Sequence, residues 1–403
     1  MLILKHKDID VAVFDSDLVL NKVLDEKLLP LHFKYGRHLK SWVDSRVIDA
    51  SRVSSRVLKK ALKMRKKDDY TTAMKVYART LTDNFWLCPN DENIRFKDLQ
   101  FKSDIYSELT LHLDINVLDV AQDAFTPELT NTGSYEKGWK LIDNVWYMYK
   151  QGRKEEVFSE IFTYKLGEAL GFDMTSYKCV DGKSVSKDFT AGGNVDFQPM
   201  YGIVGEDEAY TYNFQMLSTL DASVLTDYVN MIYLDTIVRN VDRHTKNYGL
   251  LTDVESGKII SLAPNFDNNL SLIATGYPIS PNRENDFLVK LFLAFLSEVD
   301  IIYIPPIFTK EVVRQLAIAC AQEVGLEVDV EKIIAMCVCV DKQVGAMCKI
   351  RYSVIGDKVH LKYMDRYKVL DIDKFDKWTV CKLQAGERLG VSLASKLKAV
   401  LTL

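Results

Sequence analysis

The chain has 403 residues, of which 47% are apolar and 27% are charged, proportions that are ordinary for a globular protein. This length predicts two or three structural units with enough apolar material for a buried core. The formal net charge of −4 argues against a nucleic-acid-binding surface spread over the whole chain. The sequence shows neither the run of about 20 apolar residues that a membrane-spanning helix needs nor a secretion signal. We therefore expect a cytoplasmic protein without a membrane partner, whose seven cysteines are reduced thiols.

Residues 1–105 are expected to form an accessory region of mixed α/β structure. Residues 1–20 alternate apolar and polar side chains, which predicts a strand or hairpin, and residues 39–81 show helical periodicity. Two interpretations fit the basic stretch 46–67: a surface for nucleic acid or an acidic partner, or a solvated helix face. We favour the solvated face, because no aromatic residues interleave with the cations as they do in a stacking platform. The basic residues are Arg46, Arg52, Arg56, Lys59, Lys60, Lys63, Arg65, Lys66 and Lys67.

Residues 106–190 have the pattern of a β-rich unit. Two strands are predicted at 139–142 and 145–150, joined by a turn at Asp143-Asn144, and a helix is predicted from 154 to 170, ending at Gly171. Lys150 would direct its ammonium into a cleft, paired with Glu160 of the helix, although Glu155, Glu156 and Glu168 are alternatives by sequence alone. Before the hairpin, the small residues of Thr132-Gly133-Ser134 would let backbone N–H groups approach phosphates. The strand 185–189 stands where adenine would bind, which assigns Lys187, Asp188 and Phe189 to that site.

Residues 191–370 read as mainly helical. An apolar helix at 225–238 precedes Asp242, Lys246 and Asn247, and a strand at 259–262 precedes Asp267; further helices are predicted at 285–300, 309–325 and 329–351. An aspartate, an asparagine five residues later and a second aspartate after a strand suit phosphoryl transfer from ATP. Asp242 would orient the acceptor hydroxyl, Asn247 and Asp267 would bind Mg²⁺, and Lys246 would stabilise phosphate charge. The alternatives are polar turns at both segments and an exposed strand-end lysine at Lys150.

Several of these segments resemble known kinases. Asn240 to Asn247 reads Asn-x-Asp-x-His-x-Lys-Asn, which resembles the catalytic loop of HipA-like serine/threonine kinases, while its core Asp-Arg-His-x-x-Asn also resembles that of phosphoinositide kinases. The segment 262–269 is similar to the HipA-like Pro-x-Phe/Tyr-Asp segment, and Gly133, Glu136 and Lys137 are similar to the phosphate-binding loop of that family. The resemblance spans roughly residues 120–350, with further similarity in the first hundred residues, and it stops after about residue 370.

The resemblance implies an α+β fold of the bilobal protein-kinase type, with an accessory region (1–105), a β-rich small lobe (106–190), a mainly helical large lobe (191–370) and an extension of unknown role (371–403). It implies an ATP- and Mg²⁺-dependent serine/threonine protein kinase of toxin or regulatory type, with a protein substrate and an antitoxin-like or regulatory protein partner. The inhibitory autophosphorylation serine of the family has no serine counterpart here; Thr130 stands at that place, with Thr132 and Ser134 nearby. The alternatives are a phosphoinositide kinase, a nucleotide-binding regulator without transfer activity, and a nucleic-acid-binding regulator that works through residues 46–67.

Overall fold

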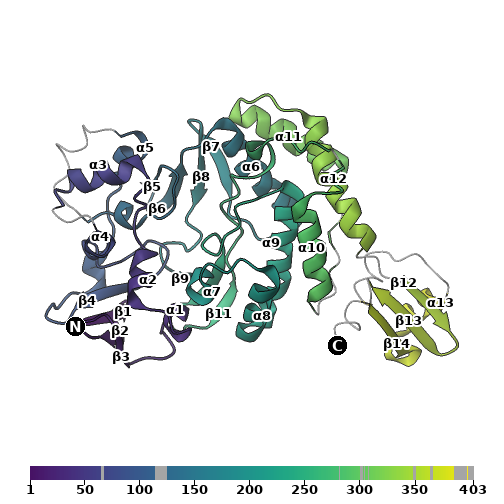
Figure 1. Ribbon diagram of the computed structural model, residues 1–403, viewed down its shortest axis with the longest axis horizontal. Helices are drawn as coiled ribbons and strands as arrows, with labels where there is room; N and C mark the ends of the chain where they lie inside the picture. Colours follow the sequence, from purple (N-terminus) through teal and green to yellow (C-terminus); the bar gives the residue numbers. More distant parts are fainter. Residues whose placement is uncertain are drawn as a thin grey trace.

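The computed structural model describes residues 1–64, 68–113, 125–280, 282–299, 303, 305–306, 308–347, 351–363, 366–384 and 397. The molecule is elongated, with the N-terminal region at one end and a small sheet at the other (Figure 1). Between them lie a four-stranded sheet, a three-stranded sheet and a group of long helices. None of the helices in the described ranges combines the length and apolar character that a membrane crossing requires.

The accessory region is built on an antiparallel sheet of order β3-β2-β1-β4. Its strands are β1 (Leu2–His6), β2 (Ile9–Phe14), β3 (Leu20–Val23) and β4 (Phe85–Pro89). Its helices are α1 (Leu31–Lys34), α2 (Leu39–Asp44), α3 (Val53–Ala61) and α4 (Asp69–Met74), with a 3₁₀ turn, η1 (Phe96–Leu99). The helix α5 (Ser107–His112) follows just after the predicted boundary at 105. The predicted N-terminal hairpin and helical unit are therefore confirmed.

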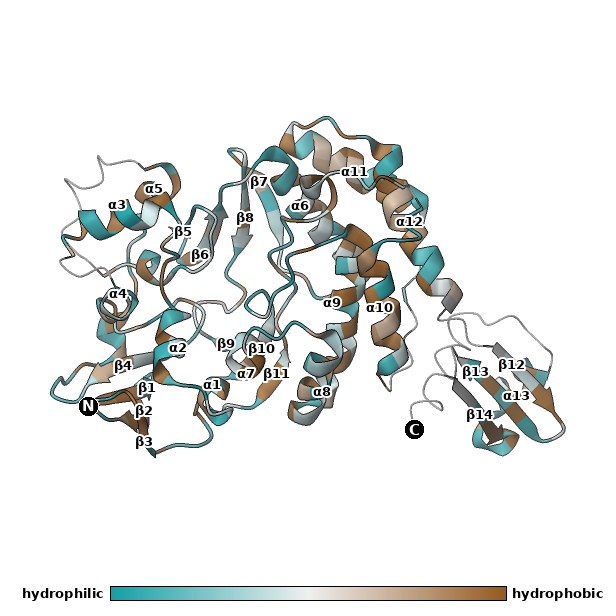
Figure 2. Ribbon diagram, viewed as in Figure 1, coloured by the Kyte–Doolittle hydropathy of each residue, from teal (hydrophilic) through white to brown (hydrophobic). Residues whose placement is uncertain are grey.

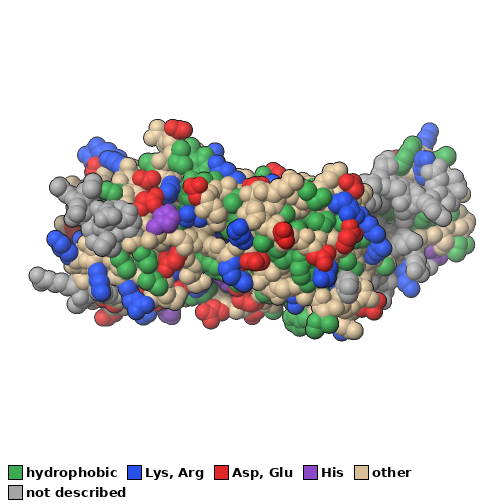
Figure 3. Space-filling model, turned by 90° about the horizontal axis from the view of Figure 1, so that it is seen from above, with side chains coloured by type: hydrophobic (Ala, Val, Ile, Leu, Met, Phe, Trp, Pro, Cys, Tyr) green, Lys and Arg blue, Asp and Glu red, His purple; other side chains and the backbone are tan. Residues whose placement is uncertain are grey.

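The basic stretch 46–67 is not the uniformly solvated face that we expected. Arg46, Arg52 and Lys59 are buried, whereas Arg56, Lys60 and Lys63 are exposed. The Arg46 guanidinium binds the Asp83 carboxylate, and that of Arg52 binds two carbonyls of the segment that follows the accessory region. Residues 65–67 lie outside the described residues. Figure 3 shows basic and acidic side chains interspersed over one face of the molecule. The basic residues of this stretch are therefore of two kinds: some are buried and bind other parts of the protein, and the others are exposed to solvent.

A second four-stranded sheet, within residues 137–187, has the order β5-β6-β8-β7. It comprises β5 (Lys137–Ile142), β6 (Val145–Lys150), β7 (Tyr177–Val180) and β8 (Lys183–Lys187), flanked by η3 (Pro127–Thr130) and α6 (Lys154–Ala169). The predicted turn is confirmed: Asp143 and Asn144 have φ of 50° and 62°, and Ile142 pairs directly with Val145, as in a tight two-residue hairpin. Trp139 and Trp146 belong to the buried apolar cluster of the accessory region, so the hairpin and that region share a core.

The described residues between 195 and 347 form a three-stranded sheet and a group of packed helices. The sheet holds β9 (Val195–Pro199), β10 (Gly249–Asp253) and β11 (Ile259–Leu262) in the order β11-β10-β9. The helices are α7 (Tyr201–Val204), α8 (Tyr210–Leu220), α9 (Leu225–Val238), α10 (Phe287–Glu298), α11 (Lys310–Val324) and α12 (Val330–Met347), with 3₁₀ turns η4 (Ala222–Val224) and η5 (Leu272–Thr275). Brown apolar residues are frequent on α9 and α10 (Figure 2), which accords with their burial in the largest apolar cluster. The predicted helices are confirmed to within a few residues. The expected end at 300 and residues 348–350 lie outside the described residues, and residue 351, where the last helix was expected to end, begins a strand instead.

The C-terminal part differs from the expectation. Residues 351–371 form an antiparallel sheet of β12 (Arg351–Ile355), β13 (Lys358–Tyr363) and β14 (Arg366–Asp371), followed by η6 (Ile372–Lys374) and α13 (Lys377–Gln384). We did not predict these strands, and the boundary expected at residue 371 separates the sheet from the helix that contacts it. Of the expected extension, 385–396 and 398–403 lie outside the described residues.

Candidate functional site

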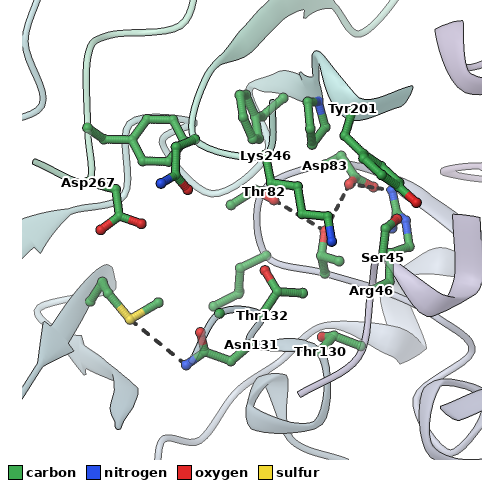
Figure 4. Close-up of a pocket in the computed structure, with 18 of the residues that line it drawn as sticks. Ser45, Arg46, Thr82, Asp83, Thr130, Asn131, Thr132, Tyr201, Lys246 and Asp267 are labelled. Atoms are coloured by element: carbon green, nitrogen blue, oxygen red, sulfur yellow. Dashed lines mark hydrogen bonds and ion pairs between the residues drawn. The ribbon is translucent and has the colours of Figure 1, made fainter. Parts of the chain in front are cut away.

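One cavity of about 660 Å³ is lined by residues of the accessory region, of the segment 127–189 and of the segment 197–267. This volume lies in the range of small-molecule sites. Figure 4 shows side chains from all three parts converging on it, including Arg46 and Asp83 of the accessory region, Thr132, and Lys246 beside Tyr201. All predicted site residues except Glu160 line the cavity: Thr132, Gly133, Ser134, Lys150, Lys187, Asp188, Phe189, Asp242, Lys246, Asn247 and Asp267.

Lys150, at the end of β6, is the centre of a buried polar cluster. Its ammonium binds the Asp267 carboxylate, lies 2.7 Å from the Asn269 Oδ1 and lies 3.5 Å from the Glu160 Oε2. Glu160 is fully buried on α6, and its other oxygen accepts a hydrogen bond of 2.6 Å from the backbone N–H of Asn268. These charged groups can be buried because each of them has an oppositely charged partner and further hydrogen bonds. The structure therefore brings Lys150 and Glu160 together, and Glu160 rather than the other three glutamates occupies this place.

The charges of this cluster reinforce one another. Burial by itself would lower the pKa of Lys150, but the carboxylates of Asp267 and Glu160 raise it above its usual range. Burial opposes ionisation of Asp267, yet Lys150 and Lys137 hold its pKa well below the usual range. Burial raises the pKa of Glu160, and Lys150 opposes that rise. Lys150 and Asp267 are therefore both charged at neutral pH.

Lys137 is a second cation in the same cavity, and it lies directly across from Lys150 in the β5–β6 register. Directly opposed residues of an antiparallel pair project to the same face of a sheet. Its Nζ would lie only 2.6 Å from a Cβ placed on Gly133, whose φ is +95°, so the ammonium sits beneath the loop tip. Among the described residues, this ammonium makes no hydrogen bond and no ion pair. Burial lowers the pKa of Lys137 to about 8; Asp267 opposes this shift and Lys150 adds to it.

Arg243 organises the loop that follows α9. Its buried guanidinium binds the Asp235 carboxylate through two hydrogen bonds of 2.8 and 2.9 Å. It also donates to the backbone carbonyls of Asn247 and Phe266, at 2.8 Å each. A planar guanidinium can satisfy several acceptors at once, which an ammonium cannot. Arg243 thus joins the two segments that carry Asn247 and Asp267, and it does not itself line the cavity.

Asp242, Asn247 and Lys246 surround the mouth of this loop. Asp242 is half-buried and lines the cavity; burial raises its pKa, His244 opposes that rise and Asp267 adds to it. The Asn247 amide nitrogen donates to the Asp242 carbonyl at 3.2 Å, which leaves the Asn247 side-chain oxygen for another partner. Lys246 is exposed and lies over the Tyr201 ring at 4.7 Å. Together these groups place a carboxylate, an amide oxygen and a cation around one space.

The phosphate loop, defined here as residues 130–137, is fixed at its ends and exposed at its tip. Thr130 is buried and its hydroxyl donates to the Arg79 carbonyl at 2.8 Å, so in this conformation it is not an accessible acceptor. Thr132, Gly133 and Ser134 are exposed toward the cavity. The positive φ of Gly133 favours glycine at this turn.

The residues expected to contact adenine differ in what they offer. The Asp188 carboxylate accepts hydrogen bonds from the Thr190 amide at 2.9 Å and the Gly192 amide at 2.8 Å, and its own N–H donates to the Trp146 carbonyl at 3.0 Å. The carboxylate and the N–H of Asp188 are therefore both engaged within the protein, and its role at adenine stays a prediction. Phe189 packs 5.5 Å from the Phe266 ring, and Lys187 is exposed.

The sequence did not indicate Asn269 or the organising role of Arg243, and it placed Lys137 in the phosphate loop without indicating that its ammonium lies beside Lys150. A signal for Lys137 was present, since a two-residue turn at 143–144 places residue 137 opposite residue 150. Asn269 and Arg243 gave no such signal, because their partners depend on how distant segments meet.

Comparison with known proteins returns structural matches alone. No protein-family model matches the chain, and a search of curated proteins finds no match. A chain of the Shewanella oneidensis MR-1 toxin–antitoxin complex of HipA, HipB and operator DNA is similar with a TM-score of 0.49 and 12% identity, over 86% of this chain and 96% of that chain. The Helicobacter pylori proinflammatory kinase CtkA is similar with a TM-score of 0.36 and 17% identity, over 51% of this chain and 89% of that chain.

Proposed function

We propose that the chain is an ATP- and Mg²⁺-dependent phosphotransferase, acting as a HipA-like serine/threonine protein kinase of toxin or regulatory type that can also phosphorylate itself. The observation that carries this proposal is the convergence of Lys150, Asp267 and Asp242 on one cavity, although Lys150 and Asp267 are 117 residues apart. Phosphoryl transfer needs positioned charges rather than covalent chemistry from the protein, and this cavity supplies them.

The residues present fit a nucleotide with its metal. The Asp267 carboxylate and the Asn247 amide oxygen are the hard donors that Mg²⁺ prefers. The described residues contain no group of three or more His, Cys, Asp or Glu side chains able to hold a metal, which suits a metal that takes its remaining ligands from phosphates and water. Bound Mg²⁺-ATP would supply the phosphoryl group and neutralise charge on it. Lys150 and the unpartnered Lys137 would bind the phosphates.

The acceptor side is assigned to Asp242 and Lys246. Asp242 has a carboxylate that faces the cavity, and it would orient the incoming hydroxyl and take its proton. Lys246 would stabilise charge on the transferred phosphoryl group. Because the accessory region lines the same cavity, an acceptor segment that reaches Asp242 also meets that region.

The test is transfer of radiolabelled γ-phosphate from ATP in the presence of Mg²⁺, with generic proteins, phosphoinositides and the chain itself as acceptors. Asp242→Asn and Asp267→Asn are expected to lower transfer by about 10²-fold or more, since each removes a charge that acts on the reacting groups. Asp98→Asn is the control, because Asp98 is exposed and does not line the cavity. Label on serine or threonine that both site variants abolish supports the proposal. Label on lipid alone would instead identify a phosphoinositide kinase, and ATP binding without transfer to any acceptor would identify a nucleotide-binding regulator.

A further inference from the structure

Arg52 of the accessory region contacts both ends of the phosphate loop. Its Nη1 donates to the Asn131 carbonyl at 2.8 Å and its Nη2 donates to the Lys137 carbonyl at 2.6 Å. Its Nε lies 3.6 Å from the Glu136 carboxylate, and its side chain is fully buried. Hydrogen bonds from a charged donor are stronger than neutral ones, and a planar guanidinium can hold two acceptors at once. One side chain therefore joins the two ends of a loop whose tip is exposed.

The rest of the accessory region supports this contact. Arg52 is the N-cap residue of α3, and the next turn adds a hydrogen bond of 3.2 Å from the Ser54 amide to the Glu136 carboxylate. The Ile48 amide donates to the Leu129 carbonyl, just before the loop, at 2.9 Å. In both bonds the donor is a backbone N–H of the segment 48–54, so the bonds depend on the position of the whole segment. A displacement of this segment would therefore move the phosphate loop.

We propose that Arg52 is a positioning residue of the nucleotide site, through which the accessory region holds the phosphate loop in its phosphate-binding conformation. Arg52 does not itself line the cavity, so it acts through the residues that it holds. One of these is Lys137, whose carbonyl binds Arg52 and whose ammonium lies beneath Gly133. The inference rests on the proposed function, and it assigns to the accessory region a role in nucleotide affinity.

The experiment compares the full chain with Arg52→Lys and with Arg56→Lys. A lysine keeps the charge but cannot bind two separate carbonyls with one planar group. Arg56 is exposed on the same helix, which makes it a matched control for the same chemical change. For each protein, the affinity for a fluorescent ATP analogue with Mg²⁺ is measured, together with hydrogen exchange of residues 129–138 without nucleotide and kcat at saturating ATP. Exchange of the β1–β4 sheet shows whether the accessory region remains folded.

We expect Arg52→Lys to weaken nucleotide binding by about tenfold and to raise exchange in residues 129–138, while kcat at saturating ATP and exchange of the β1–β4 sheet stay close to those of the wild type. Arg56→Lys is expected to change neither affinity nor loop exchange by more than about twofold. Unchanged loop exchange in Arg52→Lys overturns the proposal, as does raised exchange with unchanged nucleotide affinity. Equal weakening in both variants also overturns it. A wild-type chain that binds no nucleotide refutes the proposed function instead, a result that the wild-type titration reveals on its own.

Discussion

Lys137 makes nucleotide affinity depend on pH in a way that the neighbouring Lys150 does not. Burial lowers the pKa of Lys137 to about 8 in the nucleotide-free chain, whereas an ordinary lysine titrates near 10.4. Phosphates that bind beside this ammonium would raise its pKa again, because opposite charges favour the protonated form. The contribution of Lys137 to binding is therefore fully present below about pH 8 and is lost as the pH rises through the interval between the free and the bound pKa.

The size of the effect follows from the same two values. Affinity should fall by up to about tenfold for each pH unit above 8, until the pKa of Lys137 in the complex is reached. A return to the ordinary lysine pKa in the complex would make the total fall about two orders of magnitude. The other charged groups that face Lys137 do not titrate in this interval: the pKa of Lys150 is raised above its usual range, and that of Asp267 lies well below its own. Tyr135, whose pKa burial raises to about 12, stays neutral.

The assay is a titration with a fluorescent ATP analogue and Mg²⁺ at closely spaced values from pH 7 to pH 10. Lys137→Arg should bind with an affinity that no longer falls above pH 8, because a guanidinium stays protonated there. Lys137→Met should bind weakly at every pH. Lys140→Met, three residues along the same strand and therefore on its other face, should keep the wild-type profile. A wild-type affinity that is constant from pH 7 to pH 10, or a Lys137→Arg profile that matches it, would show that the reasoning is wrong.

Three further substitutions test the remaining parts of the site. Asp267→Asn should lower the affinity for Mg²⁺-ATP more than the affinity for metal-free ATP, since it removes a metal ligand; equal losses in paired titrations would count against that role. Glu160→Gln should lower the free energy of unfolding in urea by about 1–2 kcal/mol and raise KM for ATP. The new amide can still accept the hydrogen bond from the Asn268 backbone, but it no longer neutralises Lys150. An unchanged free energy of unfolding together with an unchanged KM would exclude a functional Lys150–Glu160 pair. Arg243→Met should lower the free energy of unfolding by about 3–5 kcal/mol, because it leaves the buried Asp235 carboxylate without its partner; a loss below about 1 kcal/mol in the same assay would contradict this.

Local signals in the sequence predicted much of the secondary structure. The turn at Asp143-Asn144 was recognisable because both residue types tolerate positive φ, and the structure confirms it. The helix at 225–238 was recognisable from its apolar run, and α9 begins and ends at those residues. Periodicity and turn chemistry depend on neighbours within a few residues, so a single sequence contains them.

The sequence could also group the candidate residues by chemistry but not by contact. It indicated Lys150, Asp242, Asn247 and Asp267 as a set, because phosphoryl transfer calls for those groups at that spacing. It could not select Glu160 by spacing alone from the four glutamates of 155–168. That selection depends on which helix face turns toward the Asn268 amide, over a separation of 108 residues.

Tertiary structure alone decided the rest. The sequence presented residues 46–67 as one basic stretch, yet Arg52 is buried against carbonyls 79 and 85 residues away, while Arg56, one helical turn later, faces solvent. It gave no sign of the sheet at 351–371. The partner of a buried cation is set by which distant segments meet when the chain closes, and its charge alone does not encode that meeting. The sequence by itself therefore determined the local elements and the chemical inventory of this protein, and the closed fold decided which of its charges form the site and which support it.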